Sequence, residues 1–552
     1  MSRIYGNIAG LKSKVRRQIE NLDRRKVNPQ DVISPDLSRD LAHLSFECGR
    51  QLALLIARSG KIERVLVGGP NSIFISELPK SREGRGRLRG LRLVHTHLKG
   101  EPISKDDLMD LVFLRLDSVG VVQVDAHGGA TTLELAHILP SSGNGGQGWE
   151  ILPPRPCYNP DLDFLELVQS LEDELERNQS AFATLRRQDR AIAVSITNAE
   201  RRLANQSINE LVELAHTGGI TVADKIIQRP RQINPRYLIG KGKLSEIILR
   251  ALQLGVDLLI FDCELNPSQV RAITDMTELR VIDRTQLILD IFAQRAQSRE
   301  GKIQVEMAQL KYLLPRLGVK DDALSRLTGG IGARGPGETK LEINRRRIKD
   351  RIANLERQLD SVRKSRQQKR SLRQRKDLPV ISIVGYTNAG KSTLLNTLTH
   401  SDVFVESRLF ATLDPASRRL RFPRDFEVII TDTVGFVQDL PQDLLDAFAA
   451  TLEELQDADL LLHVIDAGDP QVEEHIAAVE NILEQLELHR KPLIPVFNKM
   501  DITEPAVIAR CLNRYGGVAI SALSTKTLPP LIHIMEEHVE ALFTQGLFSM
   551  VF

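Results

Sequence analysis

Residues 385–392 form a glycine-rich segment whose spacing suits phosphate binding. They read G-x-x-x-x-G-K-S, between an apolar β-branched run at 380–384 that predicts a buried strand and a sequence, STLLNTL, that predicts a helix. The glycines allow consecutive backbone N–H groups to surround phosphates at the positive end of that helix. We expect Lys391 to reach the β- and γ-phosphates and the Ser392 hydroxyl to bind Mg²⁺. A chance match in a glycine-rich turn is disfavoured, because both flanking elements are present.

A second motif, Asp432-Thr433-Val434-Gly435, closes the strand-like run EVIIT. An aspartate at a strand end can hold a Mg²⁺-bound water. The Gly435 N–H can reach a γ-phosphate because no side chain stands in its way. This segment therefore predicts the part of the site that faces the terminal phosphate.

Two further segments predict which base is bound. Asn498-Lys499-Met500-Asp501 follows the strand-like PLIPVF, and the Asp501 carboxylate can accept hydrogen bonds from the guanine N1–H and exocyclic amine, which adenine cannot supply. Ser521-Ala522-Leu523 follows GVAI, where a base-contacting loop is expected. The four motifs in this order resemble a GTPase of the Ras-like superfamily. The residues expected to bind GTP are Gly385, Tyr386, Thr387, Asn388, Ala389, Gly390, Lys391, Ser392, Thr393, Asp432, Thr433, Val434, Gly435, Asn498, Lys499, Met500, Asp501, Ser521, Ala522 and Leu523.

The composition is that of an ordinary soluble protein, with 42% hydrophobic and 26% charged residues and a net charge of only +2. A length of 552 residues predicts roughly three to four domains. The four cysteines are widely separated, so we expect a reducing compartment with neither disulfides nor a cysteine zinc site. Because no apolar run approaches the ~20 residues needed to span a bilayer and the N-terminus lacks an apolar signal core, a cytoplasmic location is expected. A transit peptide is disfavoured because acidic residues follow soon.

Residues 1–150 predict a separate N-terminal α/β extension, to which the sequence assigns no role. It contains His95, His97, His127 and His137. There is no i, i+4 histidine pair and no evident carboxylate cluster beside them. We therefore expect satisfied or surface histidines rather than a metal site.

The middle of the chain predicts a linker and then a small α/β domain. Residues 140–160 are rich in Ser, Gly, Asn and Pro, and 151–208 are assigned to that linker and an amphipathic helix. Strands and helices alternate over 209–296, which predicts a small parallel sheet. Asp262 and Glu264 at a strand end could serve an active site, but capping of the next helix is the favoured interpretation.

Residues 297–376 predict an antiparallel helical hairpin. Apolar residues recur at spacings of four and three from Ile303 to Leu317 and again from Ile348 to Val362. The glycine-rich segment 328–339 lies between the two stripes. Its backbone can approach a flat or charged partner closely.

The second helix of this hairpin is strongly basic. Residues 340–376 hold 15 lysines and arginines against 4 acidic residues, and a run of one sign suggests binding to nucleic-acid phosphates. An exposed coiled-coil face followed by a flexible linker remains an open alternative. Aromatic residues are nearly absent here, which favours folded RNA recognised by shape over single strands. The residues expected to contact RNA are Gly329, Gly330, Gly332, Arg334, Gly335, Gly337, Arg345, Arg346 and Arg347.

From about residue 209 to its C-terminus the chain resembles the HflX family of ribosome-associated GTPases. The resemblance rests on GGIGARGPGETKLE, GYTNAGKSTLLN, FATLDP and DTVGF. It implies a cytoplasmic GTPase that binds the large ribosomal subunit, contacts ribosomal RNA, and splits or rescues stalled ribosomes under stress. It also implies a GTPase domain over 377–552, and it says little about the residues before about 190.

The resemblance assigns further residues around the nucleotide. Thr412 is similar to the switch threonine that completes Mg²⁺ coordination, and with it Phe410, Ala411, Leu413 and Asp414 join the expected GTP-binding residues. Together with Lys391 and Gly435, Thr412 makes up the expected catalytic set.

Two positions bear on turnover. Asn388 matches the pattern of GTPases that use K⁺ as an added positive charge. Phe436 stands where many small GTPases have a glutamine that orients the attacking water, so we expect slow intrinsic hydrolysis that a partner accelerates.

Two other function classes stay open. One is an RNA-processing or RNA-remodelling GTPase that does not act on the ribosome. The other is a signalling switch whose basic hairpin binds an acidic protein or a membrane surface. A second nucleotide site near Gly240 or Gly329 is disfavoured because no Lys-Ser/Thr pair follows those glycines. We expect a monomer.

Overall fold

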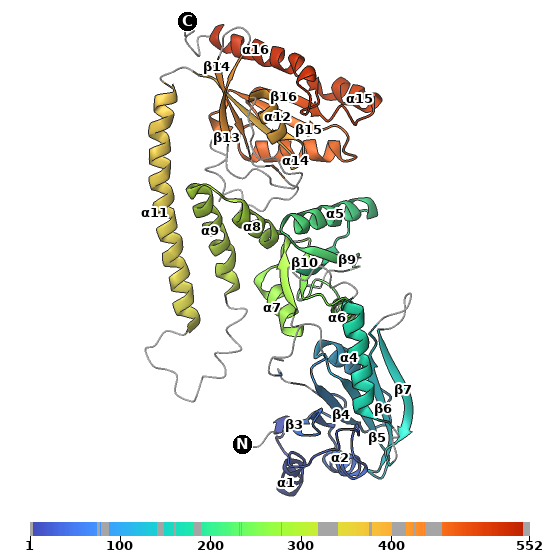
Figure 1. Cartoon of the computed structure of the whole chain (residues 1–552). Coiled ribbons are helices and arrows are strands. Elements are labelled where there is room, and N and C mark those ends of the chain that lie inside the picture. Colours follow the sequence, from blue (N-terminus) through green and yellow to red (C-terminus); the bar gives the residue numbers. More distant parts are fainter. Residues whose placement is uncertain are drawn as a thin grey trace. The chain divides into compact units, whose positions relative to one another are not determined.

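The computed structural model describes residues 4–73, 75, 78, 88–140, 148–158, 162–180, 189–230, 232, 234–277, 279–317, 340–374, 378–399, 416–422, 427–433, 435–436 and 455–544 (Figure 1). The chain divides into two compact units. One comprises residues 1–208 and 219–282, and the other comprises 209–218 and 283–552. Each unit is described by itself.

The first unit begins with a mixed seven-stranded sheet. Its strand order is β1-β3-β2-β4-β5-β6-β7, with parallel pairs at β1–β3 and β4–β5 and antiparallel pairs at β2–β3, β2–β4, β5–β6 and β6–β7. The elements are β1 (Ile4–Gly6), α1 (Ser13–Leu22), α2 (Pro35–Cys48), β2 (Leu52–Ala57), β3 (Ile62–Val67), β4 (Leu91–His97), α3 (Lys105–Phe113), β5 (Ser118–Val124), β6 (Ala130–Ile138), β7 (Trp149–Pro156) and α4 (Phe164–Ser180). Residues of α1 and α2 share one apolar core with alternate residues of the sheet, and residues of α3 share a second.

The linker predicted over 140–160 is wrong for its second half. Trp149–Pro156 forms strand β7, which pairs with β6 at the edge of the sheet. An edge strand tolerates Pro153 and Pro154 because it has partners on one side only. A proline-rich composition therefore concealed a strand.

The first unit also contains a four-stranded sheet in the order β11-β10-β8-β9. Strand β8 pairs in parallel with both β10 and β9, which confirms the predicted parallel sheet. Its first strand along the chain, at residues 190–196, lies within 151–208, where a linker and a helix were expected. The elements are β8 (Arg190–Ile196), α5 (Arg201–Thr217), β9 (Thr221–Gln228), α6 (Lys241–Gln253), β10 (Leu258–Phe261), α7 (Pro267–Met276) and β11 (Arg280–Asp283).

Asp262 does not cap the helix that follows it. Its Oδ2 accepts hydrogen bonds from the Ser195 hydroxyl at 3.1 Å and the Ser207 hydroxyl at 2.6 Å. Asn266 caps α7 instead, accepting from the Gln269 N–H at 2.8 Å. The carboxylate thus fastens α5 to the end of β8, and the capping prediction was wrong.

The second unit contains the predicted helical hairpin. It follows α8 (Arg284–Arg295) and consists of α9 (Arg299–Leu313) with a short 3-10 turn η2 (Leu314–Arg316), and α11 (Lys340–Gln374). The helices α9 and α11 lie side by side (Figure 1) and bury the two predicted apolar stripes against each other, namely Ile303, Met307, Ile352, Leu355 and Leu359. The spacing of four and three residues placed these side chains on one face of each helix.

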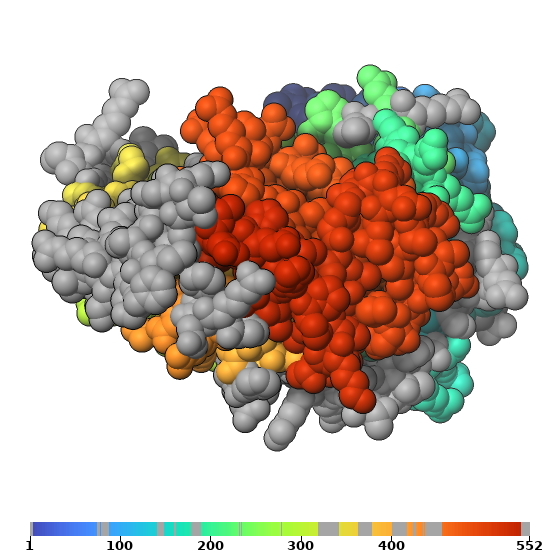
Figure 2. Space-filling model, turned by 90° about the horizontal axis from the view of Figure 1, so that it is seen from above, coloured from blue at the N-terminus to red at the C-terminus, as the bar shows by residue number. Residues whose placement is uncertain are grey.

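The rest of the second unit is a six-stranded sheet in the order β13-β14-β12-β15-β16-β17. Its neighbouring strands are parallel except for the edge pair β13–β14. The elements are β12 (Val380–Gly385), α12 (Lys391–Thr399), β13 (Ala416–Arg421), β14 (Glu427–Asp432), β15 (Leu460–Asp466), α14 (Val472–Gln485), β16 (Leu493–Asn498), α15 (Pro505–Tyr515), β17 (Val518–Ala519) and α16 (Pro529–Thr544). Figure 2 shows the later elements, coloured orange to red, as one continuous surface. In the described part of the chain, no helix is both long and apolar enough to cross a membrane.

Candidate nucleotide-binding site

Because the central strands are parallel, the four predicted motifs meet at the edge where β12, β14 and β16 end. The glycine-rich loop joins β12 to α12. Gly385 has φ +151° and Gly390 has φ +95°, a region that side chains rarely adopt. A Cβ at Gly390 would lie 2.2 Å from Asn498 Nδ2. Only glycine therefore lets the loop lie against residues 498–501, the motif predicted to bind guanine, which we call a guanine-side motif together with residues 521–523.

Lys391, the first residue of α12, is buried and held by backbone carbonyls. Its Nζ donates to the Tyr386 oxygen at 2.7 Å and to the Gly385 oxygen at 3.1 Å. Burial lowers the pKa of this ammonium to about 8, and the nearby Asp432 carboxylate opposes the shift. Burial also lowers the pKa of the neighbouring His463 to about 3, an effect that the Lys391 charge increases. The loop therefore contains a buried ammonium group that donates to carbonyl oxygens of the loop's own backbone.

Ser392 and Asp432 place oxygen atoms together beside Lys391. The Ser392 hydroxyl donates to Asp432 Oδ2 at 2.7 Å, and the Thr433 N–H donates to Asp432 Oδ1 at 2.9 Å. Asp432 is fully buried at the end of β14. A hydroxyl and a carboxylate in contact fit Mg²⁺, which prefers oxygen ligands and keeps several of its waters.

Gly435 and Phe436 continue from β14 across the glycine-rich loop. A Cβ at Gly435 would lie 2.8 Å from Thr387 Cγ2 and 3.0 Å from Lys391 Nζ, so this backbone passes directly beside the ammonium. Phe436 is bound into the loop through its backbone, donating to the Gly385 oxygen at 3.1 Å and accepting from the Thr387 N–H at 2.8 Å. Its ring is buried and faces away from water.

The two guanine-side motifs are joined to the glycine-rich loop through Asn498. Its Nδ2 donates to the Ala389 oxygen at 2.8 Å, and its Oδ1 accepts from the Ala522 N–H at 2.8 Å. In the same motif Asp501 is exposed, and Leu523 is 80% exposed. Asn498 therefore positions the loops, whereas the Asp501 carboxylate is available to a ligand.

Sequence reasoning missed two residues that support these loops, Asp466 and Thr397. Asp466 Oδ2 accepts from Nζ of the predicted residue Lys499, which has φ +65°, at 2.5 Å, and Thr397 donates to the Ala522 oxygen at 2.6 Å. Asp466 ends β15, and its place after the apolar run LLLHVI was a signal that could have identified it. The Thr397 contact depends on how α12 packs, which no local pattern encodes.

Tyr386 connects the glycine-rich loop to helices α5 and α8 within the second unit. Its hydroxyl donates to Glu210 Oε1 at 2.6 Å, and Glu210 Oε2 lies 2.9 Å from Arg284 Nη2. The Tyr386 ring stacks on His475 with 3.8 Å between ring centroids. These two rings, with His463 and Asp466, line a small cleft beside the loop. Neither Glu210 nor Arg284 stood out in the sequence.

Some predicted residues lie outside the described residues and stay predictions. They are Phe410, Ala411, Thr412, Leu413, Asp414 and Val434 near the phosphates, and Gly329, Gly330, Gly332, Arg334, Gly335 and Gly337 in the glycine-rich segment. Arg345, Arg346 and Arg347 are described and are exposed on α11.

Comparison with known proteins assigns the chain to a family. Three family models match in succession: "GTP-binding GTPase N-terminal" over residues 205–293, "GTP-binding GTPase Middle Region" over 295–373 and "50S ribosome-binding GTPase" over 380–499. A crystal structure of a GTP-binding protein from Sulfolobus solfataricus in complex with GDP is 24% identical, covers 64% of this chain and 99% of its own, and superposes with a TM-score of only 0.35.

Curated relatives named "GTPase HflX" are much more similar. One from Caldanaerobacter subterraneus subsp. tengcongensis is 48% identical over 354 residues, which is 64% of this chain and 81% of the relative. One from Escherichia coli (strain K12) is 43% identical over 337 residues, covering 60% of this chain and 79% of the relative. The consecutive family models and these identities agree with the site geometry, and the chain therefore belongs to the HflX family of GTPases.

Proposed function

We propose that this GTPase binds the large ribosomal subunit in the cytoplasm and, through GTP hydrolysis, splits or rescues stalled ribosomes. The observation that carries the proposal is the exposed basic face of α11, which includes Arg345, Arg346 and Arg347 and sits on a buried apolar stripe. A helix that packs on one side and presents arginines on the other is suited to the phosphates of a folded RNA. The matched description "50S ribosome-binding GTPase" supports the same partner.

At the nucleotide site we assign the phosphates to the glycine-rich loop and Lys391, and the guanine to Asp501. Ser392 and Thr412 would bind Mg²⁺ directly, with Asp432 acting through a water. The bound ion would neutralise charge on the β- and γ-phosphates. The contact between the Ser392 hydroxyl and Asp432 supports this donor set. We also propose that Asn388 takes part in binding K⁺ as an added positive charge. Asn388 is exposed in the loop and has φ +61°.

Hydrolysis also needs an oriented water. Phe436 is buried and tied by its backbone to the loop, so neither its ring nor its position supplies a polar group to that water. We therefore assign slow turnover to the isolated chain. The ribosomal partner would supply or order the missing group, as GTPase-activating partners do.

Co-sedimentation with large ribosomal subunits tests the RNA contact. Arg345→Ala with Arg346→Ala should weaken binding and reduce its salt dependence, by about one unit of log–log slope for each phosphate that is no longer neutralised. Arg16→Ala with Arg17→Ala removes the same charge from exposed positions on α1 and serves as the matched control. Affinity for GTP should stay unchanged in both variants.

Two results would contradict the proposal. If both double variants bound the subunit as tightly as the unchanged protein, the α11 arginines would not be the contact. If the unchanged protein bound the subunit no better than an unrelated folded RNA, the weight would move to an RNA-remodelling GTPase that acts elsewhere.

A further inference from the structure

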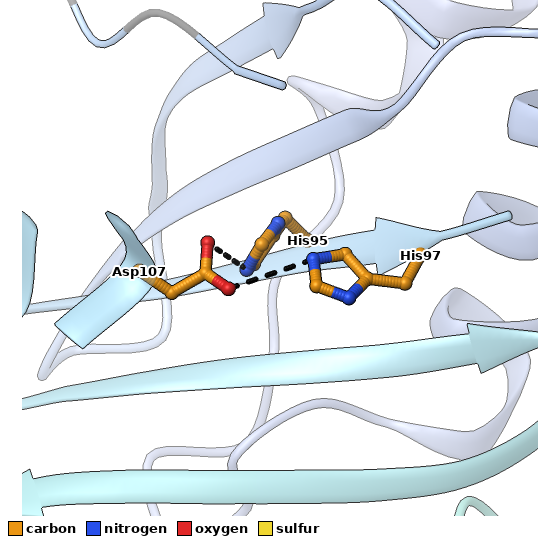
Figure 3. Close-up of side chains that lie close together, drawn as sticks. All are labelled: His95, His97 and Asp107. Carbon is orange, nitrogen blue, oxygen red and sulfur yellow. Dashed lines mark ion pairs between the residues drawn. The ribbon is translucent and has the colours of Figure 1, made fainter. Parts of the chain in front are cut away.

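A compact group of two histidines and one aspartate lies in the N-terminal sheet region, ahead of residue 205, where the family models begin to match. His95 and His97 are two positions apart on β4 and so point to the same face of the sheet. Asp107 reaches toward them from the first turn of α3 (Figure 3). The sequence shows no carboxylate cluster beside these histidines, but folding brings one carboxylate, that of Asp107, next to them from across an intervening loop.

The spacing of the three side chains fits a metal site. His95 Nε2 lies 3.3 Å from Asp107 Oδ1, and His97 Nε2 lies 3.6 Å from Asp107 Oδ2. All three ligand atoms are within 4.8 Å of one another. A tetrahedral zinc ion at ~2.0–2.1 Å from each ligand requires ligand atoms about 3.4 Å apart.

The hydrogen-bond donors and acceptors in the group do not balance. His97 Nδ1 is 2.9 Å from the Glu101 carbonyl oxygen, which can only accept, so Nδ1 carries the proton. In the neutral ring Nε2 is then an acceptor, and it faces a second acceptor, Asp107 Oδ2. Two acceptors turned toward each other call for a cation between them. A backbone carbonyl that fixes the far nitrogen is also the usual support of a metal-binding histidine.

His95 supplies an independent indication. It is 2% exposed, and neither ring nitrogen makes a hydrogen bond with any residue that the structure describes. Burying polar atoms without a partner costs about 1–3 kcal/mol, and a coordinate bond to a metal would offset that cost.

The remaining contacts hold the ligands in place. Asp107 Oδ2 accepts from the Ser104 N–H at 2.8 Å and the Ser104 hydroxyl at 2.7 Å, and the Asp107 N–H donates back to that hydroxyl at 3.2 Å. The preceding residue, Ile103, donates its N–H to the buried carboxylate of Glu134 at 2.9 Å. The helix start and the loop before it are thereby fixed against β6, so the carboxylate is presented in one orientation.

We propose that His95, His97 and Asp107 bind one Zn²⁺ ion. Two neutral imidazoles and one carboxylate suit zinc, and three protein ligands leave a fourth tetrahedral position for water or an exogenous oxygen, nitrogen or sulfur donor. Asp107 is the most exposed of the three, with 14% of its side chain accessible, so that position opens on the Asp107 side. The site is separate from the nucleotide chemistry, which belongs to the second unit.

The test is zinc binding by the full chain. Protein stripped with chelator is titrated with ZnCl₂ by calorimetry and, after desalting, its zinc content is measured. We expect one zinc per chain, a raised melting temperature, and an affinity at least about 100-fold lower in His95→Gln and in His97→Gln. His127→Gln is the matched control, because His127 is exposed in the turn between β5 and β6. Far-UV circular dichroism and cooperative thermal unfolding of each zinc-free variant verify that it has folded.

Each outcome of the zinc-binding experiment either supports or overturns the proposed site. Failure of the unchanged chain to retain zinc would overturn the proposal, as would equal retention by His97→Gln and the unchanged chain, or a clear preference for Mn²⁺ over Zn²⁺. If the histidine variants fail to fold, Co²⁺ substitution in the unchanged chain decides. The intense visible absorption of tetrahedral Co²⁺ supports the site, and the weak spectrum of six-coordinate Co²⁺ contradicts it.

Discussion

The glycine-rich loop and the His95–His97–Asp107 group both bury charged or polar side chains, but they treat them differently. Lys391 has its donors directed to two backbone carbonyls of its own loop, and Asp432 accepts from Ser392 and Thr433. In the histidine group, by contrast, one ring makes no hydrogen bond with the described residues and the other turns an acceptor toward an acceptor.

The glycine-rich loop is therefore organised by hydrogen bonds within the protein, whereas the histidine group needs a bound ion to complete its contacts. The loop holds its shape, and the Lys391 charge is already desolvated, before a nucleotide arrives. A nucleotide that binds there replaces existing hydrogen bonds of the loop with new ones. The histidine group instead gains its missing partners when metal arrives. Substitutions around the loop test the first half of this comparison; the zinc titration tests the second.

The largest expected effect is that of Lys391→Met. Hydrolysis of GTP should fall by about 10²–10³-fold, because one preorganised positive charge is removed from the phosphates. The nucleotide-free protein should nevertheless become more stable by about 1–3 kcal/mol, since a pKa lowered from 10.5 to about 8 reports a costly buried charge. Single-turnover kinetics and denaturant unfolding measure the two effects.

The pH dependence of that stability gain has a definite sign. The folded pKa is lower than the unfolded one, so the cost is fully present below pH 8 and fades as the unfolded lysine loses its proton toward pH 10.5. The variant's advantage over the unchanged chain should therefore shrink across this window. A gain that grew with pH, or a loss of stability at pH 7, would show that Lys391 is not a strained buried cation.

Asp501→Asn should lower affinity for GTP by at least about 100-fold, because the carboxylate that we propose accepts from two guanine donors is replaced by an amide. Since Asp501 is exposed and supports no described loop, the melting temperature should hardly change. Fluorescent-nucleotide titration gives the affinity. Equal loss of ATP and GTP binding would indicate damage to the loops rather than to base selection.

Gly390→Ala should reduce GTP affinity by about 10-fold or more and destabilise the protein by about 1–3 kcal/mol. The new Cβ would meet Asn498 Nδ2 at 2.2 Å, and alanine is strained at φ +95°. Gly242→Ala is the control, because a Cβ there has open space. Nucleotide titration and thermal unfolding report both changes; a neutral Gly390→Ala would contradict the close approach of the two loops.

The smallest effect on nucleotide binding is expected from Tyr386→Phe, which removes the hydrogen bond to Glu210 and leaves Glu210 paired with Arg284. Loss of one such bond to a charged acceptor costs about 1.5–3 kcal/mol. Glu210→Gln should cost at least as much, because it also leaves the buried Arg284 without its carboxylate. A double-mutant cycle of the two substitutions, read by unfolding free energy, would give no coupling if the contact were absent.

The sequence predicted best the elements that depend only on residues close together along the chain. The strand, glycine-rich loop and helix at 380–398 are contiguous, and the stripe from Ile303 to Leu310 follows from helical period alone. Prediction from the sequence failed for contacts between residues far apart along the chain. Glu210 reaches Tyr386 from another helix, and Asp107 reaches His95 across a loop. Strand β7 forms only because β6 lies beside it. Contacts of long sequence separation leave no periodic signal.

The most direct test of the proposed function is GTP turnover by the purified chain with and without large ribosomal subunits at fixed salt. The unchanged chain should turn over slowly alone and be strongly stimulated by the subunits. Arg345→Ala with Arg346→Ala should lose most of that stimulation while keeping the basal rate. Equal turnover with and without subunits would contradict the proposal that a ribosomal partner completes a site in which Phe436 cannot orient water.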